Sequence, residues 1–452
     1  MNNSIPPAGV ADLERDLASL DSSRRHSALT QLAGLLKQGE ITCPPAEAIA
    51  NMHGHTFFSY NPDFYSPSQF AWLARRRGLG LAGLVDFDVL DGLEEFHEAG
   101  RLLELKTCVS IETRVFVPEF SSRVINSPGE PGIAYHMGVG FTAAPTTRWA
   151  TEFLASLRET AGRRTRELTE RVNAFLQPVE LDHDRDVLPL TPQGNATERH
   201  LCLAYARKAA ATFSDTQALA AFWADKLDTP ADTLDLPEGP KLQAHIRART
   251  MKRGGVGYVQ PDADSFPRLD DMNRFALEAG AIPTIAWLDG TTDGEQALDE
   301  WMDVASQSGA AAINLIPDRN YTPGVQDEKL NNLYEVVQKA ERRGFPIIVG
   351  TELNGPGQKF VDDFDSEELK PLADGFMKGA YITFAHTALQ ATAGMGYLSE
   401  WAGAHFTDVH EKNTFYAECG RLLPSSYEKP LSNVSADNTP DQVMETARKT
   451  TS

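Results

Sequence analysis

The sequence predicts an α/β fold, a distorted (β/α)7-8 barrel with a helical insertion. Short apolar runs bounded by turn residues recur along the chain, and amphipathic helices that end in glycine separate several of them. Runs of this length are typical of buried strands. Their alternation with helices indicates a parallel sheet, open or closed into a barrel. Seven or eight such strands favour the barrel.

The first part of the chain contains N-terminal helices and the first barrel half. Residues 1–47 hold two short amphipathic helices with leucine stripes, within residues 10–38. The barrel half spans residues 48–147, and its predicted strands are 48–55, 79–88, 106–116 and 134–141. A helix between the first two strands ends at Gly78, and glycine suits the left-handed position that closes a helix.

Residues 148–250 interrupt this alternation. One long helical pattern covers residues 148–176, and "NATE" (195–198) and "SDTQ" (214–217) resemble capping boxes that begin two more helices. We interpret this stretch as a helical insertion between the barrel halves.

The second barrel half spans residues 251–415. Its predicted strands are 282–290, 311–320, 346–354 and 380–387, and the helices between them end at Gly280, Gly309 and Gly344. Residues 416–452 are predicted to be a polar C-terminal tail, of which the last 25 or so residues are expected to be loosely ordered.

The composition excludes several classes of protein. The formal net charge of −21 disfavours nucleic acid and anionic membranes as partners. No apolar run of about 18 residues is present, so we expect no membrane span. The four cysteines are far apart and the N-terminus lacks the pattern of a secretory signal, which fits a reducing cytoplasm. We therefore expect a cytoplasmic protein that acts on a small molecule, and nothing in the sequence predicts its oligomeric state.

Histidines and acids stand at the ends of several predicted strands, where sites gather in alternating strand–helix folds. His53 and His55 are two residues apart, so one strand end can direct both to one ion. A single histidine in such a position is more often structural, but successive strand ends with histidine or acid favour a metal site. Histidine together with carboxylate suits Mn, Zn or Fe. The candidate ligands are His53, His55, Asp88, Glu112 and His136.

The order of these segments resembles the PHP (polymerase and histidinol phosphatase) superfamily of metal-dependent phosphoesterases. "HGHTFFS" (53–59) matches its HxHT motif, "VDFDVLDG" (85–92) takes the place of its TDHD-type segment, "SIETRVF" (110–116) matches its glutamate strand, and "YHMGVGF" (135–141) matches its next histidine. The resemblance covers residues 48–145 well and 280–360 more loosely. It implies a distorted (β/α)7 barrel, which agrees with the strand count.

The chain also departs from the family pattern. Phe87 replaces the histidine of TDHD, Tyr60 or Asn61 stands where an acid is expected, and Glu352 and Asn354 replace the late SDxH pair. These departures favour one ion, or two held partly by Asp86, Asp88 or Glu352, over the full three-metal centre.

The predicted catalytic residues are Asp86, Glu352 and His386. Asp86 or Glu352 could orient ligands or relay a proton. His386 is a candidate general acid or additional ligand, and the alternative is a buried histidine bonded to backbone.

Phosphate recognition requires cations. Lys252 and Arg253 stand beside three glycines in "MKRGGVGY", and with Asn354 they are the predicted substrate-binding residues. Arg163, Arg164 and Arg166 could cover the mouth of the barrel, although a solvated helix face is the simpler role for them.

The leading hypothesis is a metal-dependent hydrolase of PHP type. It would be a phosphoesterase that acts on a small phosphorylated metabolite through metal-activated water. The alternatives are a PHP-like binding or regulatory protein without turnover, and a metal-dependent barrel isomerase or lyase.

Overall fold

The computed structural model describes residues 9–450, and its centre is one sheet of seven strands. The strands follow one another in chain order across the sheet. They are β1 (Glu47–Gly54), β2 (Leu79–Phe87), β3 (Lys106–Phe116), β4 (Ile133–Val139), β5 (Ile282–Trp287), β6 (Ala312–Leu315) and β7 (Ile347–Val349).

The sheet is nearly closed into a distorted α/β barrel, as predicted. Closure occurs between the first and last strands, where Gly54 forms a parallel bridge with Glu352 and the His55 amide donates to the Glu352 carbonyl at 2.7 Å. The prediction of a wholly parallel sheet was wrong, because β4 runs antiparallel to both β3 and β5. The β3–β4 connection, residues 117–132, contains only a short 3₁₀ turn, whereas the crossover between parallel strands is usually an α-helix.

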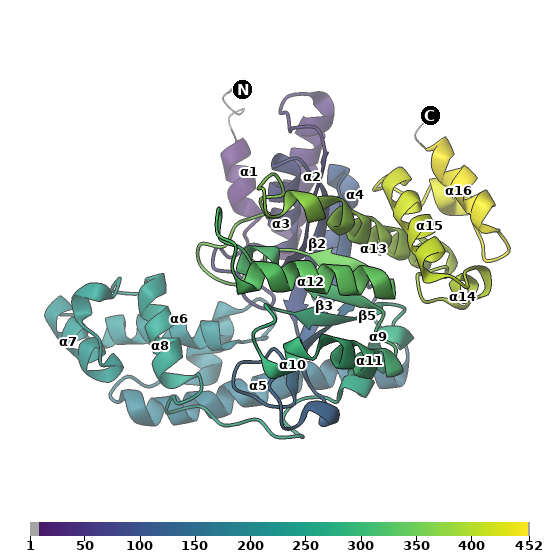
Figure 1. Cartoon of the computed structure of the whole chain (residues 1–452). Coiled ribbons are helices and arrows are strands. Elements are labelled where there is room, and N and C mark those ends of the chain that lie inside the picture. The colour runs from purple at the N-terminus through teal and green to yellow at the C-terminus, as the bar shows by residue number, and fades with distance from the viewer. Residues whose placement is uncertain (1–8, 451–452) are drawn as a thin grey trace.

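Amphipathic helices cover the outside of the barrel (Figure 1) and bury their apolar faces in one core cluster with the strands. The α12 helix ends as predicted, with Gly344 in the left-handed conformation at φ 71°. The helices with apolar faces in this cluster are α3 (Pro67–Arg76), α4 (Leu93–Leu103), α9 (Leu269–Glu278), α11 (Leu298–Gln307) and α12 (Glu328–Arg343). The short α10 (Asp293–Gln296) precedes α11 and contributes no apolar side chain to it.

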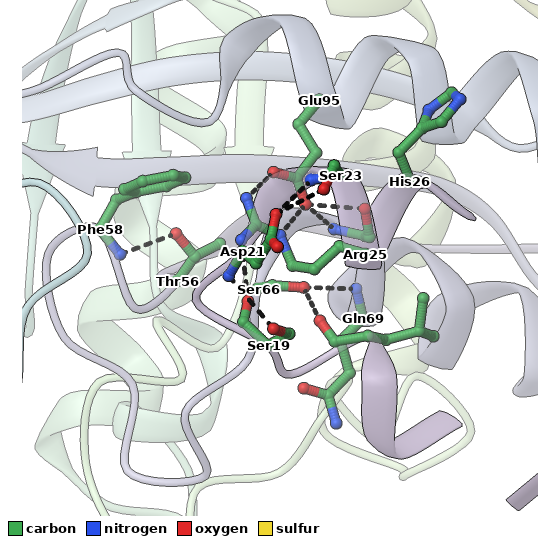
Figure 2. Close-up of polar contacts among 12 residues, drawn as sticks. Ser19, Asp21, Ser23, Arg25, His26, Thr56, Phe58, Ser66, Gln69 and Glu95 are labelled. Carbon is green, nitrogen blue, oxygen red and sulfur yellow. Dashed lines mark hydrogen bonds and ion pairs between the residues drawn. The ribbon is translucent and has the colours of Figure 1, made fainter. Parts of the chain in front are cut away.

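The N-terminal helices α1 (Val10–Asp16) and α2 (Ser22–Gln38) are joined to the barrel by an ion pair with a buried arginine. Figure 2 shows Arg25 of α2 directed at Glu95 of α4. Nε of Arg25 donates to Oε1 of Glu95 at 2.9 Å, and the Arg25 side chain is 3% exposed. Its guanidinium also lies 5.1 Å from the centre of the Phe57 ring, in the loop after β1.

The C-terminal part is helical and corrects two predictions. Residues 380–387, predicted as a strand, lie inside the helix α13 (Ala373–Ala393). A short apolar run cannot by itself distinguish a buried strand from a buried helix. The tail predicted to be loosely ordered contains α16 (Pro440–Lys449), and its boundary at residue 416 falls inside α15 (Val409–Leu422).

These helices, with α14 (Glu400–His405), bury apolar side chains in a second core cluster that also contains inward-facing strand residues. The packing orders the segment despite its polar composition. Residues 451 and 452 lie outside the described part of the tail, as residues 1–8 do for the N-terminal segment.

The predicted insertion is present and has its own apolar core. It contains α5 (Arg148–Leu176), α6 (Glu198–Thr212), α7 (Thr216–Leu227) and α8 (Pro240–Thr250). In Figure 1 it lies on the opposite side of the barrel from α14–α16. The cap of α6 is Thr197 with His200, two positions after the predicted Asn195.

Short turns of other helix types complete the description: η1 (Pro118–Phe120), η2 (His183–Val187), η3 (Leu188–Leu190), η4 (Ala231–Thr233), η5 (Pro317–Arg319), η6 (Lys370–Leu372) and η7 (Pro430–Asn433). No helix within residues 9–450 combines the length and apolar character needed to cross a membrane.

Candidate metal centre

Three predicted ligands meet at the end of the barrel where β1 and β3 finish. Nε2 of His53 lies 3.2 Å from Nε2 of His55, and Oε2 of Glu112 lies 3.5 Å and 3.2 Å from these two nitrogens. All three side chains are buried, with exposed fractions of 1%, 0% and 5%. Two parallel strands, β1 and β3, which β2 separates in the sheet, and the loop after β1 thus supply a compact group of ligand atoms.

Asn314 of β6 orients His53. Nδ1 of His53 lies 3.0 Å from Oδ1 of Asn314, and the amide nitrogen of Asn314 donates to the Ile348 carbonyl. Because an amide oxygen only accepts hydrogen bonds, Nδ1 of His53 carries the proton. Its Nε2 therefore presents a lone pair to the cluster.

Ser59 and Asp86 orient His55 in the same way. The Ser59 hydroxyl donates to Oδ1 of Asp86 at 2.6 Å, so its oxygen is free to accept from Nδ1 of His55 at 3.0 Å. The Thr56 amide and hydroxyl also donate to Asp86, at 2.9 Å and 2.6 Å. Carboxylates that fix a ligating histidine through its second nitrogen are common around metals. Asp86, predicted as catalytic, is placed here to orient a ligand.

The electrostatics of the cluster favour a positive charge at its centre. Burial acts to raise the pKa of Glu112, but His53 and His55 outweigh it and lower this pKa to about 2. Burial acts to lower the pKa of His53, and Glu112 outweighs it and raises that pKa. These shifts describe histidines that carry a second proton towards Glu112. With Nδ1 alone protonated, Oε2 of Glu112 is buried without a hydrogen-bond donor, and a cation can take the place of that proton.

The donor set fits a divalent transition metal. Two imidazole nitrogens and one carboxylate oxygen suit Mn, Fe or Zn, and three protein ligands leave positions open for water or substrate. Phe87 lies beside the cluster, with its ring 4.3 Å from that of His55. It cannot bind an ion at the place where the resemblance led us to expect a histidine.

Asp88 and Glu352 lie outside the cluster formed by the three ligands. Asp88 accepts from the Thr113 hydroxyl at 2.6 Å, and its other oxygen is 3.7 Å from Arg164 of the insertion. Glu352 pairs with Arg319 at 3.3 Å. Both residues have positive φ, 62° and 64°, a conformation that is costly without glycine and that is found at functional sites.

Two predicted histidines point elsewhere. His136 is adjacent to Met137, which pairs with Glu112 across β3 and β4, so His136 occupies the outer face and bonds to Asn273 of α9. His386 lies in α13, where its Nδ1 accepts from the Tyr397 amide at 2.9 Å. The predictions of His136 as a ligand and His386 as a catalytic residue are therefore corrected to structural roles, because alternation and helix formation direct both away from the cluster.

The predicted substrate-binding residues are separated. Lys252 pairs with Glu198 of α6 at 2.8 Å, within a group of cations between the insertion and the barrel. Arg253 is exposed and lies against Gly129, outside that group. Asn354 is half-buried in the loop after β7, and its side chain has no hydrogen bond among the described residues.

The sequence reasoning missed Arg114. It stands two residues after Glu112 in β3, so both side chains share one face of the sheet, and Tyr135 pairs with it across β4 on that face. The same spacing rule that united His53 and His55 could have found it. Arg199 and Arg247 of the insertion were also missed, and no local motif distinguishes them.

Comparisons with known proteins give a few structural likenesses. No protein-family model and no curated protein matches the chain. An amidohydrolase from Chromobacterium violaceum, solved with bound sulfate and no metal, is 16% identical with a TM-score of 0.46, covering 72% of this chain and 96% of its own. A candidate metal-dependent phosphoesterase from Bifidobacterium adolescentis is also 16% identical with a TM-score of 0.46, covering 74% and 98%. We therefore base a function on this chain's own residues.

Proposed function

We propose that the protein is a metal-dependent hydrolase, and that it is a phosphoesterase of PHP type acting on a small phosphorylated metabolite. The observation that carries this proposal is the convergence of His53, His55 and Glu112. Their three ligand atoms lie within 3.5 Å of one another, and Asn314 and Ser59 hold both imidazoles with lone pairs inward. Such buried electron pairs repel one another unless a cation lies between them.

These three residues would hold one ion, Mn, Fe or Zn. When bound, such an ion supplies Lewis acidity, which lowers the pKa of water and polarises a phosphoryl oxygen. Asp86 and Ser59 keep His55 in the ligating orientation. Glu352 is near enough to His53 to interact with it electrostatically, and we assign it proton transfer at the reacting group.

Arg114 supports a phosphoester as the substrate. Its guanidinium is on the same face of β3 as Glu112, and it stacks 4.2 Å from the centre of the Phe266 ring. A guanidinium forms paired hydrogen bonds with phosphate oxygens and remains charged at every physiological pH. Arg114 also pairs with Glu130 at 3.0 Å, and in a protein with net charge −21 a guanidinium on this face is a local cation that suits an anionic substrate.

A second candidate function is metal-dependent binding without turnover. The contact of Phe87 with His55 favours it, because an aromatic ring takes the position of a further ligand. A protein of this kind would retain the ion and the anion-binding arginines but would not hydrolyse esters.

Elemental analysis with an activity screen tests the proposal. We expect near-stoichiometric Mn, Fe or Zn in the purified protein, loss of that metal in the His53→Ala/His55→Ala double variant, and no loss in the exposed-site control His405→Ala. We also expect the metal-loaded wild type to hydrolyse aryl phosphates and the double variant to be inactive. Absence of metal after reconstitution with each ion would refute the metal centre. Bound metal without hydrolysis across a phosphoester panel would favour the binding function.

A further inference from the structure

The insertion brings four cations to the mouth of the barrel, close to Arg114. They come from three of its helices and the turn after α8, and we call them the insertion cations: Arg164, Arg199, Arg247 and Lys252. Each interacts electrostatically with one carboxylate, Glu198 at the start of α6, and Arg114 does the same. Arg247 and Lys252 contact Glu198 directly, at 2.9 Å and 2.8 Å.

Positive charge exceeds negative charge in this group. Arg114 and the insertion cations, five positive charges, form ion pairs with only three carboxylates, which are Asp88, Glu130 and Glu198. The cations are at least partly buried, and burial lowers the pKa of Arg164 to about 10, which still leaves it charged at neutral pH. Burying uncompensated charge costs free energy, so the arrangement favours a bound anion.

Arg199 differs from the other insertion cations because it forms no ion pair with any of the described residues. No carboxylate of the described residues is within ion-pair distance of its guanidinium, which lies 6.0 Å from the centre of the Tyr60 ring. A Cβ built on Gly355 would be 3.8 Å from Nη2 of Arg199. Arg199 therefore lies between the loop after β1 and the loop after β7, the two loops that flank the ligand cluster.

Two phenols near these cations lack partners as well. Neither Tyr60 nor Tyr135 makes a side-chain hydrogen bond to any residue in the range 9–450, although Tyr60 is only 9% exposed. Tyr60 interacts electrostatically with Arg199 and Arg247, and Tyr135 with Arg114 and Arg247. Neither hydroxyl oxygen is among the fully buried polar atoms that lack a partner, so both reach accessible space and are free to donate to a ligand with acceptor oxygens.

From these contacts we infer that the insertion forms a second anion subsite, with Arg199 as its specificity-determining residue. The substrate then carries a second anionic group, a phosphate or a carboxylate, in addition to the scissile phosphate. This inference depends on the proposed phosphoesterase function only in taking the scissile group to be a phosphate. The second anionic group is inferred from the insertion cations. The ion and Arg114 serve that first phosphate, whereas the insertion cations come from other elements and remain for the second group.

Anion binding by metal-free protein tests the subsite without any turnover. The full-length protein, stripped of metal with a chelator, is titrated with inorganic pyrophosphate by calorimetry. We expect one site, about tenfold weaker in Arg199→Gln and unchanged in the control Arg207→Gln, whose residue lies on the same helix and pairs with Glu238 at the surface. Equal affinity in wild type and Arg199→Gln, or no binding, would overturn the subsite.

A set of synthetic esters tests the substrate class. Phenyl phosphate is compared with 4-carboxyphenyl phosphate and with 1,4-phenylene bisphosphate. We expect a higher kcat/KM for at least one doubly anionic ester, with the preference reduced about tenfold in Arg199→Gln through KM. The better of the two identifies the second group as carboxylate or phosphate. Hydrolysis of all three with equal efficiency would contradict the inference alone. Pyrophosphate binding that depends on Arg199, without hydrolysis of any ester, would contradict the proposed function alone.

Discussion

Single hydrogen bonds decide which nitrogen of each histidine faces the ligand cluster. The Ser59 hydroxyl joins His55 to Asp86, and the Asn314 amide joins His53 to the Ile348 carbonyl. No sequence motif around Ser59 or Asn314 predicts a metal site. Even so, Ser59 determines the tautomer of His55, and Asn314 determines that of His53. The ligands themselves follow a simple rule, since i and i+2 side chains share a face.

Replacing Ser59 by alanine is expected to weaken metal binding without removing a ligand. His55 would lose the acceptor that orients it, and loss of such a partner typically costs at least about tenfold in metal affinity. Competition with a chromogenic chelator measures the affinity, and circular dichroism verifies the fold. Ser156→Ala, on the exposed face of α5, is the control. Unchanged affinity in Ser59→Ala would contradict the orienting role.

Of the five candidate ligands predicted from the sequence, the structure brings three together, and it places Asp88 and His136 outside their cluster. His53, His55 and Glu112 were identifiable because strands β1 and β3 were identifiable. The prediction for His136 was wrong by one position, because it is Met137 that lies opposite Glu112 and faces inward. A one-residue difference reverses the face of a strand, and it is set by pairing with neighbouring strands rather than by the local sequence.

At the scale of elements, α2 is held to the barrel by Arg25. The partners of this arginine are Glu95, at 2.9 Å, and the Ser19 carbonyl, at 2.8 Å. Ser68 at the start of α3 donates to the same carboxylate, so one glutamate joins three helices. The neighbouring Arg24 instead forms an exposed pair with Asp16.

Arg25→Ala is expected to lower the free energy of unfolding by about 3–5 kcal/mol, because it leaves the largely buried Glu95 carboxylate without its counter-charge. Urea denaturation measures the change. The matched control is Arg24→Ala, for which we expect no measurable difference. Equal stability of the two variants would show that the Arg25–Glu95 pair does not hold α2 in place.

The insertion is tied to the metal-site loops by Asn195. Its amide nitrogen donates to the Phe58 carbonyl at 3.1 Å and to the Phe87 carbonyl at 2.8 Å. These carbonyls belong to the loops that carry Ser59 and Asp88. The sequence assigned Asn195 to a helix cap, and its actual partners are more than 100 residues away along the chain.

Asn195→Asp is expected to loosen the insertion, because a carboxylate would face two carbonyl oxygens and donate to neither. Amide hydrogen exchange should become faster in residues 56–60 and 86–90, while the apolar core of the insertion keeps its protection. Gln193→Glu introduces the same charge at an exposed position nearby and serves as the control. Identical exchange rates in both variants would show that the Asn195 hydrogen bonds do not hold the insertion to these loops.

At the scale of the whole molecule, buried histidines couple stability to pH. Burial lowers the pKa of His136, His200 and His386 to about 4 each. The unfolded chain binds protons more readily at these sites, so their contribution to stability is present above pH 6.5 and is lost as the pH falls towards 4. Glu295 and Asp362, whose pKa values burial raises to about 7, act in the opposite sense over this range.

A comparison of His386→Gln with wild type separates the effect of His386 on pH-dependent stability from that of the other titrating groups. In His386→Gln, the amide oxygen can accept from the Tyr397 amide, and no proton is taken up on unfolding. We expect the loss of stability from pH 7 to pH 4 to be smaller than in wild type by on the order of 3 kcal/mol. Denaturation across this range measures it, with the exposed His405→Gln as control. Parallel pH profiles for His386→Gln and wild type would contradict the assignment.

Local periodicity was enough to predict the seven strands, most of the outer helices, the insertion and the three candidate ligands that converge. These features depend on short-range patterns: alternation in strands, apolar stripes and glycine caps in helices, and i, i+2 spacing at strand ends. Folding in three dimensions was needed for the antiparallel β4, the helical state of residues 380–387, the ordered C-terminal helices and the cations around Glu198. Each of these depends on contacts between segments far apart in the chain, and such contacts leave no periodic trace in the residues that make them.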